Sequence, residues 1–242
     1  MNNINSLRSD SLVERAVGYP YEITSNSFTF KGGCAEPFDH SLTSGRYPII
    51  GYGSNQSPKR LFQKYGISNN PIPVQRGFLD DHDVVYSAHF SSYGSLPAAL
   101  IYAKGTTVSI SVNWLDKSQL QIMHSTEWDH YDYVKLNNIS LKLLEGEVLH
   151  EAYVYLCTSG CTTTMGAPIS LAEIPAKGRI YEELKQIDMQ VILRNRFRPK
   201  MDLSDFITEN VSNEKVRLSR TRRLINSSIK VNFSEHTFIG YS

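Results

Sequence analysis

The chain has 242 residues, 40% of them hydrophobic, which is enough for one substantial core. Charged residues make up 20% and the formal net charge is +1, so the overall charge favours neither a nucleic acid nor a membrane surface as partner. The three cysteines, Cys34, Cys157 and Cys161, are too few and too dispersed for a disulfide framework or a zinc site. No apolar run is long enough to cross a membrane, so we expect a cytoplasmic protein with reduced thiols.

Residues 1–46 are rich in Asn and Ser, and we expect them to form an extension packed on the main domain. A short helix is expected at 11–17 and a strand at 21–30. Nothing in this segment points to chemistry.

The segment 47–55 is an apolar run that stops in a turn of glycine, serine and asparagine. A helix is expected next, since Ser57 can cap it, Pro58 fits its first position and Gly66 suits a left-handed end. Two glycines within three residues let the backbone approach a ligand, and the N–H groups of a helix start can bind a negatively charged oxygen. The turn is therefore either a binding loop for a carboxylate or oxyanion, or a tight connection without a ligand.

Strands are expected in quick succession at 83–90, 96–103, 106–114, 138–144 and 148–157. A glycine marks each of the two turns between the first three strands. Short strands joined by turns favour antiparallel pairing. The expected fold class is therefore α+β, with a curled, mostly antiparallel sheet or a small barrel and short flanking helices.

A second helix is expected after the third of these strands, because Asp116 can cap it and Gln119 completes a capping box. Helical spacing places Leu120, Met123 and Glu127 on one face. If the two apolar residues point into the core, the Glu127 carboxylate points to the interior or its rim, where it can take part in proton transfer. If the helix frays before its end, the carboxylate is solvated instead.

Two separate stretches carry a resemblance to a known family. Tyr52-Gly53-Ser54-Asn55 after an apolar strand, followed by a short helix with Arg60-Leu61, resembles the signature of the gamma-glutamylcyclotransferase-like superfamily. The downstream order of strand, short helix, Glu127 and then Tyr131 before a further strand is similar to the segment of that family that holds its catalytic glutamate. The resemblance covers roughly residues 47–156.

The resemblance implies an enzyme of transferase or lyase type that releases 5-oxoproline and an amine from a small gamma-glutamyl compound. It implies no metal and no organic cofactor, and it assigns general acid and base chemistry to Glu127. The residues that it implies for substrate binding are Tyr52, Gly53, Ser54, Asn55 and Tyr131. The chain departs from the family at Trp128, where many members have glycine, and at Tyr133, where plant-type relatives often have arginine. These departures leave the carboxylate in place and the substrate open, so a non-catalytic small-molecule-binding or regulatory protein on the same fold is the alternative.

The chain thus divides into an extension (1–46), a gamma-glutamylcyclotransferase-like core (47–157) and a helical, partly basic C-terminal extension (158–242). An amphipathic helix is expected in the last part, where four apolar residues follow helical spacing: Ile180, Leu184, Ile187 and Val191. Between 194 and 230, ten Lys or Arg residues against four Asp or Glu residues give a net charge of +6. This stretch is either a nucleic-acid surface or a solvated, partly packed face. We expect the latter, and hence a small-molecule substrate and no nucleic-acid or membrane partner.

Overall fold

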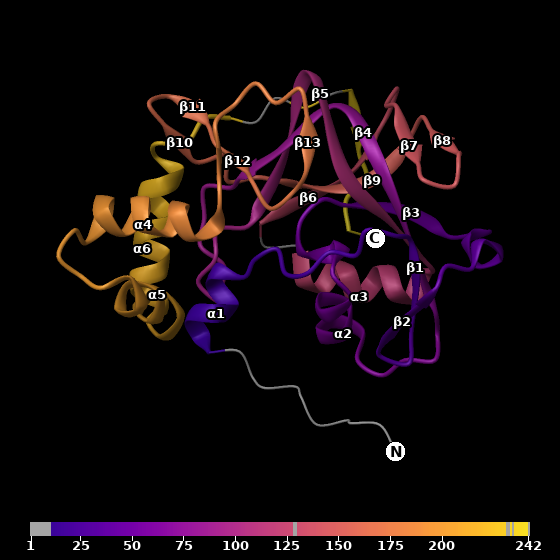
Figure 1. Ribbon diagram of the computed structural model, residues 1–242, viewed down its shortest axis with the longest axis horizontal. Helices are drawn as coiled ribbons and strands as arrows, with labels where there is room; N and C mark the ends of the chain where they lie inside the picture. The colour runs from indigo at the N-terminus through magenta and orange to yellow at the C-terminus, as the bar shows by residue number, and fades with distance from the viewer. Residues whose placement is uncertain (1–10, 128–129, 231–232, 234, 242) are drawn as a thin grey trace.

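The computed structural model describes residues 11–127, 130–230, 233 and 235–241. A large sheet forms the body of the molecule, with one group of helices at one end and a second group beside the sheet (Figure 1). The α-helices are α1 (Leu12–Val17), α2 (Pro58–Tyr65), α3 (Lys117–Glu127), α4 (Gln186–Phe197), α5 (Leu203–Ser212) and α6 (Glu214–Ile225), and the 3-10 helices are η1 (His40–Thr43) and η2 (Ser54–Gln56). The strands are β1 (Phe28–Lys31), β2 (Cys34–Pro37), β3 (Tyr47–Gly51), β4 (Ile72–Tyr86), β5 (Ala98–Leu115), β6 (Tyr131–Leu136), β7 (Leu141–Leu143), β8 (Val148–Leu149), β9 (Ala152–Cys157), β10 (Thr163–Thr164), β11 (Ala167–Pro168), β12 (Ser170–Leu171), β13 (Ala176–Lys177), β14 (Glu183–Leu184) and β15 (His236–Phe238).

The main sheet runs in the order β14-β12-β4-β5-β3-β9-β6-β15. Most neighbours are antiparallel, and the parallel pairs are β3 with β9 and β12 with β14. This confirms the expected α+β class with a mostly antiparallel sheet. Within the described residues the path has two ends, so the sheet is open and the alternative of a small closed barrel is wrong.

Strands β4 and β5 are longer than the sequence indicated. The three strands expected at 83–90, 96–103 and 106–114 fall largely within these two strands, although residues 87–90 and 96–97 lie outside them. The two strands pair along their length with a register shift between Asp80 and His82. At the shift, Asp81 has φ 56°, and its Oδ1 accepts a hydrogen bond of 2.7 Å from the N–H of Gly105. Gly105 has φ 85° and lies within β5. It therefore marks a bulge that bends a continuous strand, and not the turn that we expected.

The helices that precede and follow the β4–β5 pair in the chain, α2 and α3, follow their local signals. Helix α3 is confirmed: Asp116 Oδ1 accepts from the Gln119 N–H at 2.9 Å, and Gln119 Oε1 accepts from the Asp116 N–H at 3.1 Å. Helix α2 begins at Pro58 and ends before Gly66, whose φ is 62°, as expected. Ser57 holds the cap position, but its side chain makes no capping hydrogen bond.

Other expected elements are shorter or displaced. The strand expected at 21–30 is limited to β1, because Tyr21 has φ 72° and is not extended. Strand β7 likewise begins after Asn138, which has φ 54°. The helix expected from Ile180 onward begins only at Gln186, since β14 precedes it and pairs with β12. The N–H of Gln186 donates to Glu173 Oε1 at 2.8 Å at the start of α4.

Segments from both ends of the chain contribute to the same core as the central strands. A capping box between Ser11 and Glu14 caps the N-terminus of helix α1, and Ala16 within the helix is fully buried. Helices α4, α5 and α6 gather at one end of the molecule near α1 (Figure 1). Among the described helices, none is long and apolar enough to cross a lipid bilayer.

Candidate active site

Strand β3 carries the loop 52–55 from the middle of the sheet to a pocket. The strand lies between β5 and β9, so the sheet fixes the start of the loop on both sides. The buried Tyr52 donates its hydroxyl hydrogen bond to the Tyr155 carbonyl at 2.5 Å. On the other side, the Asn113 side chain donates to the Asn55 carbonyl at 3.1 Å. The loop is therefore held by contacts that do not depend on a ligand.

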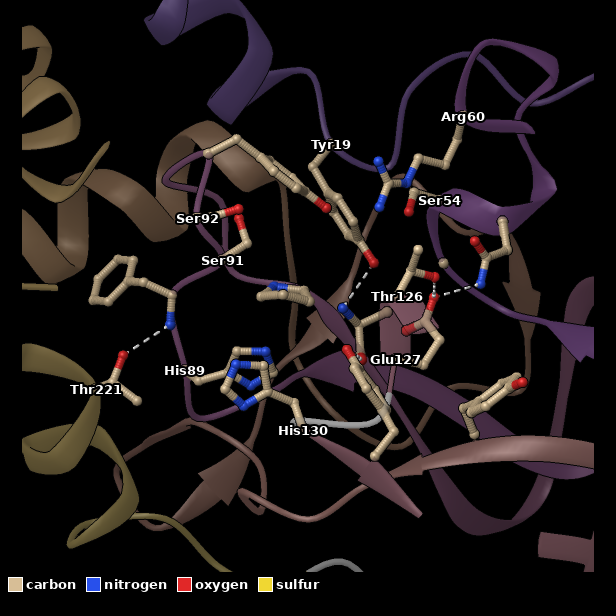
Figure 2. Close-up of a pocket in the computed structure, with 18 of the residues that line it drawn as sticks. Tyr19, Ser54, Arg60, His89, Ser91, Ser92, Thr126, Glu127, His130 and Thr221 are labelled. Atoms are coloured by element: carbon tan, nitrogen blue, oxygen red, sulfur yellow. Dashed lines mark hydrogen bonds between the residues drawn. The ribbon is translucent and has the colours of Figure 1, made fainter. Parts of the chain in front are cut away.

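Gly53 faces the side chain of Tyr19. A Cβ atom at Gly53 would lie 2.4 Å from Tyr19 Oη and 3.2 Å from the Ala98 Cβ, so this position requires a residue without a side chain. Tyr19 Oη accepts a hydrogen bond from the Ala98 N–H at 2.9 Å (Figure 2). Burial raises the pKa of Tyr19, so the phenol stays protonated and keeps an O–H to donate. Tyr19 was not predicted as a site residue, because no motif in residues 1–46 indicates a catalytic or binding role.

Glu127 is the last residue of α3, and its carboxylate lies beside the loop. Its Oε1 accepts a hydrogen bond from Asn55 Nδ2 at 3.2 Å, and Lys64 Nζ forms a close ion pair with the same oxygen. Thr126 Oγ1 lies 3.5 Å from it (Figure 2). No described residue donates a hydrogen bond to Oε2. Helix α3 extends to Glu127, so it does not fray before this residue. The Glu127 side chain is 14% exposed, so the carboxylate is neither fully solvated nor fully buried.

Lys64 is a cation that the sequence analysis did not consider. Its side chain is only 1% exposed, and its Nζ lies 3.0 Å from the sulfur of Met123 as well as against Glu127. Burial lowers the pKa of Lys64, and the Glu127 carboxylate opposes this shift. The available signal was helical spacing, because Lys64 follows the fully buried Leu61 by three residues and shares its face of α2.

The loop and the carboxylate line one pocket of about 470 Å³. All six residues that the sequence indicated line it: Tyr52, Gly53, Ser54, Asn55, Glu127 and Tyr131. Tyr131 is part-buried, and its hydroxyl donates to the Ala98 carbonyl at 3.4 Å. Tyr133 does not line the pocket but stacks on Tyr153, and Trp128 lies outside the described residues.

Segments outside the expected core complete the pocket. Tyr19 comes from the N-terminal segment, and α6 contributes Arg217 and Thr221. Thr221 Oγ1 accepts a hydrogen bond of 3.2 Å from the Phe90 N–H, which ties α6 to the pocket wall (Figure 2). Helix α6 of the C-terminal segment therefore forms part of the site and not only its surroundings.

Two histidines, His89 and His130, also line the pocket. The rings of His89 and His130 stack with their centroids 4.4 Å apart (Figure 2). His89 is 1% exposed, and no described residue bonds to its Nδ1. Burial, and secondarily His130, lowers the pKa of His89 to about 3, so the ring is neutral near pH 7. A neutral imidazole can both donate and accept a hydrogen bond.

The pocket thus places the Glu127 carboxylate, the Tyr19 phenol and the neutral His89 imidazole around a fixed glycine loop. Three further charged residues also line it: Arg60, Glu214 and Arg217. Among the described residues, no group of three or more His, Cys, Asp or Glu side chains is arranged to hold a metal ion. The polar groups suit a small ligand that carries both hydrogen-bond donors and acceptors.

Fold and pocket together define an α+β protein with a partly buried carboxylate beside a glycine loop at the end of a central strand. The sequence matches no protein-family model and no curated protein. Among solved structures, the chain is similar to a gamma-glutamyl cyclotransferase, with 15% identity over 75% of this chain and 99% of that one and a TM-score of 0.38. It is also similar to an uncharacterized protein from Homo sapiens (14% identity, 81% and 94% coverage, TM-score 0.39) and to a protein from Arabidopsis thaliana (12% identity, 72% and 89% coverage, TM-score 0.37). The first of these bears the name of the family that the sequence resembles.

Proposed function

We propose that the protein is a gamma-glutamyl cyclotransferase-like enzyme that releases 5-oxoproline and an amine from a small gamma-glutamyl compound. The observation that supports it is the state of Glu127. One oxygen of this carboxylate is held by Asn55 and Lys64, while the other lacks a described partner and the side chain lines the pocket. A positioned carboxylate with one free oxygen is the arrangement that proton transfer to and from a bound amine requires.

The reaction requires few catalytic groups. The α-amino nitrogen of the substrate attacks its own γ-carbonyl carbon, and this new C–N bond closes the five-membered ring. Glu127 Oε2 takes the proton that the attacking nitrogen loses. The bond from the γ-carbon to the leaving nitrogen then breaks, and Glu127 returns the proton to that nitrogen. Such acid and base catalysis contributes about 10²- to 10⁴-fold in rate, and neither a metal nor an organic cofactor takes part.

Charge develops on the γ-carbonyl oxygen when the ring closes. The protonated hydroxyl of Tyr19 and the backbone N–H groups of the 53–55 loop are the donors that we assign to this oxygen or to the substrate carboxylate. Loss of one donor of this type costs roughly 3 kcal/mol of transition-state stabilisation. The pocket walls hold the substrate folded so that its reacting ends meet, which supplies the remaining acceleration through proximity.

The test is a panel of gamma-glutamyl amino acids, peptides and amines incubated with the purified full chain, with 5-oxoproline as the readout. We expect at least one compound to release 5-oxoproline and its amine in equal amounts. A mock purification from cells that lack the protein serves as the control for contaminating activity. Glu127→Gln, which keeps the shape of the side chain and removes the base, tests the role assigned to Glu127. Absence of 5-oxoproline from the whole panel would contradict the proposal.

A non-catalytic small-molecule-binding or regulatory protein is the alternative. The Lys64 ion pair favours it, since a carboxylate already engaged by a buried ammonium group can serve to close the pocket and not to move a proton. Calorimetry separates the two: binding of a gamma-glutamyl compound to the wild-type chain without 5-oxoproline release would support the alternative.

A further inference from the structure

We propose that a second pocket binds a small organic anion with an apolar body, and that Arg76 holds its charged end. This pocket has a volume of about 540 Å³ and shares no lining residue with the candidate active site. Besides Arg76, it is lined by residues of five segments, among them Ile23, Phe78, Ser109, Leu144 and Pro175.

Arg76 lies in β4 and is only 6% exposed. Its Nη1 donates to Gln56 Oε1 and, at 2.8 Å, to Ser111 Oγ, and its Nη2 donates to Ser109 Oγ at 2.6 Å. A guanidinium group has five N–H donors. Among the described residues, the Nε–H and one N–H of Nη2 have no acceptor. These two nitrogens form one edge of the group, which is the edge that binds a carboxylate through two parallel hydrogen bonds.

The charge of Arg76 is also uncompensated by the described residues. Its hydrogen-bond partners, Gln56, Ser109 and Ser111, are all neutral. Burial lowers the pKa of Arg76 to about 10, and no charged neighbour contributes to this shift. Glu173 lines the same pocket. One of its oxygens accepts from the Gln186 N–H at 2.8 Å, and the other is buried with no hydrogen-bond partner among the described residues. Burial raises the pKa of Glu173, which lessens its repulsion of an anion, and no described hydrogen bond or ion pair joins it to Arg76. Buried charges in proteins are normally paired, so this arginine has a position for an anion and no protein group that fills it.

A purely structural role explains only part of this arrangement. The three bonds to neutral partners join β4 to η2 and β5, and they account for where the guanidinium lies. They do not account for its charge, because bonds to neutral acceptors do not compensate the cost of burying a cation.

The rest of the pocket indicates what else the anion carries. Phe78 is 40% exposed and Leu144 is 48% exposed, and both line this pocket with Ile23 and Pro175. Apolar surface of this kind gains stability when a ligand removes it from water. A bare inorganic ion would leave it uncovered, whereas a short-chain carboxylate would cover it and place its charge on Arg76.

Isothermal titration calorimetry on the full chain near pH 7 tests the proposal with hexanoate, its neutral analogue hexanamide, and inorganic phosphate. We expect hexanoate to bind at least about tenfold more tightly than either of the other two, because only hexanoate offers both a charge and an apolar chain. Equal binding of hexanamide, equal binding of phosphate, or no binding of hexanoate at millimolar concentration would each overturn the proposal.

Two variants assign the site. Arg76→Met keeps much of the side-chain volume without the charge, and it should reduce hexanoate binding to the level of hexanamide while circular dichroism stays unchanged. Phe78→Asp changes an exposed lining residue and should weaken hexanoate about tenfold or more by repulsion, so it decides the question even if Arg76→Met does not fold. Ile67→Asp is the matched control, since Ile67 is 81% exposed and lines neither pocket. Hexanoate binding that is equal in folded Arg76→Met and wild type, or in Phe78→Asp and Ile67→Asp, would overturn the assignment.

Discussion

Lys64 and Glu127 form an ion pair that joins helix α2 to the end of α3, with 1% and 14% of their side chains exposed. The pair fixes one carboxylate oxygen at the edge of the pocket. Removal of one partner of a buried pair is costly because it leaves an uncompensated charge in a poorly solvated place. The two residues are therefore coupled in stability, whatever the pocket binds.

Lys64→Met should lower the free energy of unfolding by about 3 kcal/mol at neutral pH, because it leaves the Glu127 carboxylate without its cation. Addition of Glu127→Gln to this variant should restore about 1 to 3 kcal/mol, since the second change removes the unpaired charge. Urea denaturation of the two single variants and the double variant measures the coupling. Purely additive losses would show that the ion pair contributes nothing to the fold.

The second prediction concerns turnover. With the substrate found in the panel described above, Glu127→Gln should lower kcat by at least about 10²-fold and leave binding of the substrate nearly unchanged. Single-turnover kinetics with 5-oxoproline detection measures the first quantity, and calorimetry measures the second. A Gln variant that turns over at the wild-type rate would exclude Glu127 as the acid and base, even if the protein is an enzyme.

The parts of the site that sequence analysis predicted are those with local signals. The caps of α2 and α3 depend on residues within four positions of each other, so the capping roles of Asp116 and Gly66 can be predicted from the sequence. The face of α3 that carries Glu127 follows from helical spacing alone. The family resemblance assigned the loop 52–55 and Glu127 to one site, and in the structure Asn55 Nδ2 lies 3.2 Å from Glu127 Oε1.

The residues that were missed reach the pocket through tertiary packing. Tyr19 touches Ala98 across 79 positions of the chain, and Thr221 touches Phe90 across 131, so no local pattern connects them. Arg76 was not predicted as a binding residue for a different reason. Its partners are neutral residues of η2 and β5, and pairing of buried cations is usually sought among acidic residues.

Gly53→Ala provides a third prediction. The new Cβ would lie 2.4 Å from Tyr19 Oη, and the buried tyrosine ring has little room to move. Overpacking of this type costs about 1 to 3 kcal/mol, which thermal denaturation can detect. Tyr19→Phe removes the clashing oxygen, so the double variant should be more stable than Gly53→Ala alone. If Tyr19→Phe gives no such rescue, the hydroxyl is not what excludes a side chain at Gly53.

The last prediction is a dependence of stability on pH that arises from His89. Burial holds the pKa of this residue at about 3 in the folded protein, below the usual value of 6.5 that applies when the chain is unfolded. Between these values the unfolded chain binds a proton that the folded chain does not, so stability is greatest above pH 6.5 and falls as the pH drops toward 3. The contribution is about 1.4 kcal/mol per pH unit between pH 6 and 4. Urea denaturation across this range should show a steeper loss of stability in the wild type than in His89→Gln, which cannot titrate there. Equal slopes in the wild type and His89→Gln would mean that His89 is accessible to protons in the folded state.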